Sequence, residues 1–136
     1  MKTSEDLESY LVELGLPYEE VETDLWIVKD EAEQVAILVS LYGPVILIRI
    51  NICNRPADEP KELYRLLLKL NATELLYGAY GLEGEHVVLV EVLSVEHTSF
   101  AMFRETLEAL FMTVATQRGM IERAAGRSLQ TSNQEG

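Results

Sequence analysis

Hydrophobic residues recur along the chain with two different periods, which separates helices from strands. Leu7, Leu11 and Leu14 follow the i, i+4, i+7 spacing of one helical face. Two β-branched, apolar runs flank Gly43-Pro44, and this tight-turn signal predicts a hairpin. In order, the pattern predicts a helix over 4–14, strands over 25–28, 35–42 and 45–53, a helix over 60–70, strands over 75–82 and 86–95, and a last helix from residue 98 or 99.

Capping residues define the ends of the predicted helices. Thr3 and Asp6 have the spacing of a capping box at the start of the first helix, and Gly15 is a natural stop. Asn71 follows the apolar stripe of the second helix and is able to adopt the left-handed cap conformation. We therefore expect the second helix to end at this asparagine.

The predicted element order is α-β-β-β-α-β-β-α, and strands joined by tight turns pair antiparallel. The fold class is therefore α+β, an antiparallel sheet with helices, and not a doubly wound fold. Residues 1–124 are expected to form a single domain. The pattern fades after Ala124 into Ser, Gln, Asn and Gly, so residues 125–136 are predicted to be a disordered tail.

The strands carry more apolar residues than one buried sheet face requires. Each central strand has one fully apolar face and an opposite face too apolar for plain exposure in an antiparallel sheet. Either the long last helix covers this second face, or a partner does. A homodimer is the commonest way to close such a surface. The candidate residues for dimer formation or protein binding are Leu38, Tyr42, Val45, Leu47, Val87 and Leu89 in the sheet, with Phe111 and Met112 in the last helix.

The chain is strongly acidic, with a formal net charge of −12. Residues 1–34 alone hold eleven acids and two lysines. This balance argues against a nucleic-acid partner and against binding to an anionic membrane surface. The apolar runs are also shorter than the ~20 residues of a membrane helix, and the N-terminus shows no secretory signal. We therefore expect a cytoplasmic protein.

No catalytic, cofactor or metal site is expected. Cys53 is the single cysteine and has no catalytic partner at a recognisable spacing, which favours a buried structural role. His86 and His97 flank a strand that would hold them roughly 36 Å apart, too far to share a metal ion. The glycines Gly78, Gly81 and Gly84 lack the spacing and the following helix of a dinucleotide loop, so they indicate a bent hairpin.

Several segments together resemble a known family. The helix end Leu66–Asn71, the segment Tyr77–Gly84 and the run Val87–Leu89 show an apolar-Asn helix end, a small-residue strand, a turn and an apolar strand. This order is similar to the CesT-like type III secretion chaperones and, more closely, to the related YbjN family of bacterial regulators. One departure is Leu70, where many YbjN members have tryptophan.

The resemblance implies a type III secretion chaperone-like fold and a homodimer that binds another protein without enzymatic turnover. Secretion chaperones hold an extended client segment on apolar surface patches, so a client protein is the expected partner. The alternative function is a small-molecule-binding domain or an unrecognised small enzyme. A pocket with convergent polar groups would favour this alternative, whereas a broad apolar surface would favour protein binding.

Overall fold

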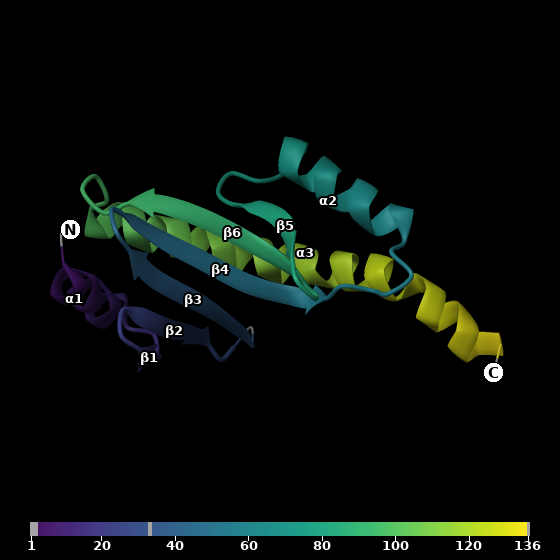
Figure 1. Ribbon diagram of the computed structural model, residues 1–136, viewed down its shortest axis with the longest axis horizontal. Coiled ribbons are helices and arrows are strands. Elements are labelled where there is room, and N and C mark those ends of the chain that lie inside the picture. The colour runs from purple at the N-terminus through teal and green to yellow at the C-terminus, as the bar shows by residue number, and fades with distance from the viewer. Residues whose placement is uncertain (1–2, 33, 136) are drawn as a thin grey trace.

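The computed structural model describes the backbone of residues 3–32 and 34–135 and the side chains up to residue 126. Within these residues the strands form one antiparallel sheet in the order β1-β2-β3-β4-β6-β5 (Figure 1). The elements are α1 (Ser4–Leu14), β1 (Tyr18–Glu22), β2 (Leu25–Asp30), β3 (Val35–Tyr42), β4 (Val45–Asn54), α2 (Lys61–Thr73), β5 (Ala79–Glu83), β6 (His86–Ser94) and α3 (Phe100–Glu135).

The long helix α3 runs along one face of the sheet, with α1 near its start and α2 beside β5 (Figure 1). Burial follows the helical and strand periods, because each helix turns one apolar stripe toward this face. Tyr10 of α1 places its ring edge-on to Phe100 of α3, with 5.5 Å between the ring centroids. The core between the layers includes Leu7, Leu11, Ile37, Ile46, Ile48, Ile50, Leu63, Leu67, Phe103, Leu107 and Leu110.

The α+β antiparallel class is confirmed, and one strand was missed. The structure has four strands before α2, because β1 forms a hairpin with β2 that the sequence pattern did not indicate. β1 reads Tyr-Glu-Glu-Val-Glu and is almost entirely exposed. An edge strand of this kind buries little, so it lacks the apolar alternation by which strands are recognised.

The first helix matches its prediction at both ends. The Thr3 side chain accepts a hydrogen bond from the Asp6 backbone, and the Asp6 side chain accepts one from the Thr3 backbone. Gly15 ends the helix in the left-handed region at φ +80°. The capping residues therefore predicted both ends of α1 correctly, because these groups satisfy backbone donors and acceptors that the helix itself leaves unpaired.

Asn71 has a different role from the predicted helix cap. α2 continues to Thr73, and Glu74 occupies the cap position. The Asn71 side chain instead turns toward β5, where Nδ2 donates to the Tyr80 carbonyl at 3.1 Å and the Tyr80 N–H donates to Oδ1 at 2.7 Å. Asn71 thus fastens α2 to the sheet.

Helix α3 extends past the sheet at its C-terminal end (Figure 1). Its apolar stripe continues through Ile121 to Ala124 and Ala125, which are buried. The backbone is helical as far as Glu135, whereas side chains from residue 127 onward lie outside the described ones. The disorder of residues 125–136 and the domain end at residue 124 therefore stay predictions.

Candidate protein-binding surface

One face of the sheet is left open by the helices that the structure describes. On β3 and β4, the residues opposite the core set are paired across the strands, with Tyr42 beside Val45 and Ser40 beside Leu47. Tyr42 is 72% exposed and Leu47 is 38% exposed, whereas Leu38 and Val45 are half-buried. Four of the predicted residues therefore lie together on one surface, here called the open face.

Strand β6 extends the open face, but not through the residues that were predicted. Val87 and Leu89 lie in the core beneath the helices, and their assignment to the second face was wrong. Both alternating sets on this strand are largely apolar, and Glu91 belongs to the set of Val87 and Leu89, so alternation alone does not show which set faces the helices. The register decides it, because Val92 pairs with Leu47 and Val90 pairs with Arg49.

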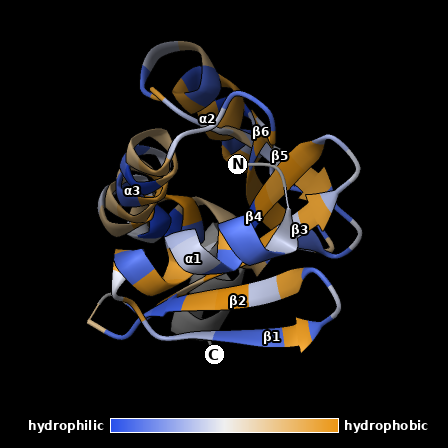
Figure 2. Ribbon diagram, turned by 90° about the vertical axis from the view of Figure 1, so that its left-hand side faces the viewer, coloured by the Kyte–Doolittle hydropathy of each residue, from blue (hydrophilic) through white to orange (hydrophobic). Residues whose placement is uncertain are grey.

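Besides the half-buried Val90, sequence reasoning missed Val92 on the open face. It is 53% exposed and lies beside Leu47 in the sheet. The alternation of the strand could have indicated it, since Val92 belongs to the set of alternating residues opposite Val87 and Leu89. Figure 2 shows how hydrophobic positions spread over the strands of the sheet.

The open face contains a shallow hollow with one ion pair. Its volume is about 380 Å3, and it is lined by Leu25, Leu38, Ser40, Leu47, Ile48, Arg49, Glu83, Val90, Glu91 and Val92. Arg49 Nη1 bonds Glu83 Oε1, and both side chains are partly exposed. Such a surface pair adds little stability. Its consequence is that Arg49 offsets one of the two carboxylates that line the hollow, Glu83 and Glu91, in a chain that is strongly negative as a whole.

Phe111 and Met112, the predicted residues of the last helix, lie away from the open face. Phe111 belongs to the core, and Met112 is 65% exposed. Both line a second depression between α1, β2 and α3, here called the α1–α3 groove. The eight predicted residues thus divide among the open face, the core and this groove.

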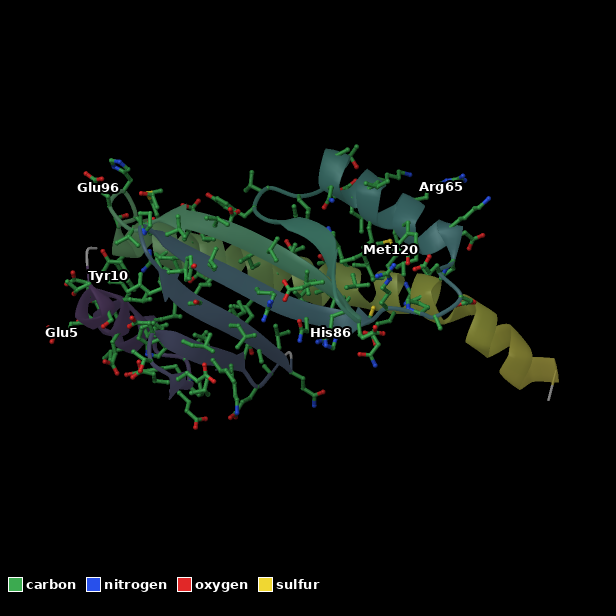
Figure 3. The ribbon with its side chains drawn as sticks, viewed as in Figure 1. Glu5, Tyr10, Arg65, His86, Glu96 and Met120 are labelled. Atoms are coloured by element: carbon green, nitrogen blue, oxygen red, sulfur yellow. The ribbon has the colours of Figure 1, made fainter. Side chains whose placement is uncertain are left out.

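The candidate chemical groups are separated from one another. Figure 3 shows His86 and Glu96, the neighbour of His97, at opposite ends of the sheet. In the described part of the chain, His, Cys, Asp and Glu side chains form no cluster of three that could hold a metal ion. Burial, with a smaller effect of the Glu122 charge, raises the pKa of the Cys53 thiol. A raised pKa opposes the thiolate form that nucleophilic chemistry requires.

The described helices include none long and apolar enough to cross a membrane.

Gly78 and Gly84 have positive φ angles of +83° and +57°. A side chain at Gly78 would press on Leu89 and Leu110, at about 3.1 and 3.0 Å from an added Cβ. Gly78 and Gly84 therefore serve the backbone of the β5–β6 hairpin and its entry, as the sequence indicated, whereas Gly81 has no positive φ angle and no close neighbour that would exclude a side chain.

Solved structures share the fold. YbjN from E. coli aligns with a TM-score of 0.67 at 17% identity, covering 87% of this chain and 93% of that one. A chain of the ExsC–ExsE complex gives a TM-score of 0.67 at 17% identity, with coverages of 89% and 97%. The match to the Yersinia pestis type III secretion chaperone SycH, solved with a stable fragment of YscM2, has a TM-score of 0.60 at 21% identity, covering 83% of this chain and 97% of that chain.

Sequence comparison gives the family directly. Among curated proteins, no sequence matches the chain. The profile of one protein family, however, matches residues 1–125, which is nearly the whole chain. This agrees with the apolar-Asn helix end and the small-residue strand, which the structure joins through Asn71 and Tyr80. The chain belongs to the CesT_Tir_1 family.

Proposed function

We propose that this chain is a non-enzymatic, chaperone-like protein of the cytoplasm that pairs with a second copy through the open face and binds a client protein on its remaining apolar surface. The observation that carries the proposal is the row of Leu47 and Val92 beside the exposed Tyr42, on three neighbouring strands. A monomer would leave this contiguous apolar surface in water, and such surfaces mark sites of association.

The charge distribution supports a second copy on the open face. Two subunits of net charge −12 repel each other over most approaches. The open face lessens this repulsion in part, because Arg49 offsets one of its two lining carboxylates, Glu83 and Glu91. A two-fold axis through the hollow would bring the same residues of each subunit together, as an isologous interface requires.

Family membership supports the client. Two solved relatives, SycH with its YscM2 fragment and the ExsC–ExsE complex, are complexes with another protein. The separated histidines and the raised pKa of the Cys53 thiol support the absence of catalysis. Together these features favour binding over turnover.

Sedimentation equilibrium at micromolar concentrations tests the pairing. The wild-type chain is expected at twice the 15.3 kDa subunit mass. Leu47→Asp and Val92→Asp should each shift the mass to one subunit, because a carboxylate would be buried at the interface. The matched control is Leu68→Asp on α2, where Leu68 is 70% exposed and lies outside the open face. A single-subunit wild type, or dissociation by the control alone, would overturn pairing through the open face.

A further inference from the structure

The α1–α3 groove is a second surface with its own chemistry. It has a volume of about 460 Å3 and lies where the ends of α1 and β2 meet the first half of α3. Its walls are mostly apolar, and its charged lining side chains are the two carboxylates Asp30 and Glu108. The lining residues are Leu14, Leu16, Asp30, Leu107, Glu108, Phe111, Met112 and Ala115.

The groove fits a few side chains of a bound segment. Its volume falls within the roughly 300–1,000 Å3 of small binding pockets, so it is too small for a folded domain. Phe111 is largely buried, whereas Met112 is mostly exposed. An unbranched methionine adapts its shape to different apolar groups. Apolar side chains that enter the groove would leave water against these residues and gain hydrophobic stabilisation.

The backbone around the groove favours a helical occupant. The lining residues come from α1, the turn after it, α3 and the last residue of β2. None of these positions offers the free edge of a strand to an extended chain. A helix satisfies its own backbone hydrogen bonds and needs only an apolar stripe to dock.

Charge selects a basic occupant. The groove borders the part of the chain, residues 1–34, that holds eleven acids and two lysines. Glu108 has Arg104 Nε at 4.0 Å, but this is an exposed pair on the helix surface and is weak. Lysine or arginine beside the apolar stripe of a bound helix would be attracted, and acidic residues there would be repelled.

We propose that the α1–α3 groove binds an amphipathic helical segment of a partner protein that carries lysine or arginine beside its apolar stripe. This inference rests on the proposed function, since it names the site and the chemistry of the client. It is separate from the open face, which holds the second copy.

Fluorescence anisotropy with the full chain and labelled 18-residue synthetic peptides tests the inference. The first peptide has leucines at helical spacing and lysines elsewhere, the second replaces each lysine with glutamate, and the third scrambles the first. The first should bind at least about tenfold more tightly than either of the others. Equal binding of the scrambled peptide would show charge attraction alone, and equal binding of the glutamate peptide would remove the charge argument. Either result overturns the proposal.

Two matched variants locate the binding. Met112→Lys places a cation in the groove and should weaken the lysine peptide about tenfold. Met102→Lys makes the same change at an exposed position of the same helix outside the groove, and should weaken it less than about twofold. Equal weakening by both would overturn the site. As a second variant with little risk to folding, Glu108→Gln removes one lining carboxylate and should weaken the same peptide measurably; unchanged affinity would contradict the role of charge.

The two proposals fail independently of each other. Leu47→Asp, as a single subunit, should bind the lysine peptide with unchanged affinity. If the wild-type dimer fails to bind the peptide, the groove inference is wrong and the pairing stands. If Leu47→Asp leaves the mass at two subunits while the peptide binds, the pairing through the open face is wrong and the groove inference stands.

Discussion

The side-chain amide of Asn71 makes both hydrogen bonds to Tyr80 that a neighbouring strand would make, one to its carbonyl and one from its N–H. Because β5 pairs with β6 on its other side, Asn71 occupies the outer edge of the sheet. The Tyr80 hydroxyl donates in turn to Gln117 Oε1 at 2.6 Å, which joins β5 to α3. Asn71 and Tyr80 thus connect helices α2 and α3 to the edge of the sheet.

Replacing Asn71 should therefore destabilise the fold. Asn71→Leu leaves the Tyr80 N–H and carbonyl without partners at a part-buried site, which costs about 1–3 kcal/mol for each unsatisfied group. Urea unfolding measures the loss. Lys69→Ala, an exposed change on the same helix, is the control and should stay within about 0.5 kcal/mol. A variant as stable as the wild type would show that the amide bonds contribute nothing net.

Adjacent leucines on α2 provide a test of its orientation. Leu67 is buried against the core and Leu68 is exposed. Leu67→Ala should reduce the free energy of unfolding by about 2–5 kcal/mol, because a core cavity forms. Leu68→Ala should change it by less than about 0.5 kcal/mol. The reverse order in denaturant melts would contradict the packing of α2.

Salt should tighten the pairing of two subunits. Each carries a net charge of −12, and screening weakens their mutual repulsion. The dimer dissociation constant from sedimentation equilibrium should therefore fall as sodium chloride rises from about 0.05 to 0.5 M, over which the Debye length shortens severalfold. A constant that rises with salt would indicate an interface held by attraction between opposite charges.

The Cys53 thiol should react slowly in the folded chain. Burial first, and the Glu122 charge second, raise its pKa above the ordinary value of 9.0, so the reactive thiolate is scarcer at neutral pH than in the unfolded chain. Labelling with a disulfide reagent at pH 7.5 should be slower for native than for urea-unfolded protein. Equal rates would show that the thiol is neither shielded nor shifted.

The C-terminal tail should be dispensable for stability. Ala125 is buried, so the cut belongs just beyond it, at residues 127–136. Deleting these residues should leave the melting temperature nearly unchanged, because the polar run from Gln130 lacks an apolar stripe to bury. A large drop in the melting temperature would mean that the tail docks on the body.

Local signals predicted the parts of this fold that local interactions determine. The ends of α1 follow from Thr3, Asp6 and Gly15, and β3 follows from its turn and its alternation. Pairing between distant segments determined the rest. Asn71 lies within the helix because its side chain bonds to Tyr80, nine residues away. Helix-capping rules consider only residues near the helix end, so they do not predict this bond. Likewise, Val87 and Leu89 face the helices because of the register with β4.

The candidate surface was predictable only in part, for a physical reason. In a strand that is apolar on both faces, the two sets of alternating residues look alike. Only a polar residue in one of the sets indicates which face of the strand meets water. β3 and β4 have such polar residues in Ser40 and Arg49, and the residues predicted for the second face of these strands do lie on the open face. β6 has Val90 and Val92 on its outward side and Glu91 on its inward side. The polar residue of this strand therefore indicated the wrong face as the exposed one.

The two borders of the sheet are protected by different means. At β5 an amide from α2 already holds the outward-pointing groups of Tyr80. At β1 three glutamates in five residues line an exposed strand, so another strand approaching there meets negative charge. Side-by-side growth of the sheet from copy to copy is thereby opposed at both ends. Pairing across the open face, as proposed above, is then the remaining way for two sheets to meet, and a two-fold pairing of this kind would close after two copies instead of propagating into a fibre.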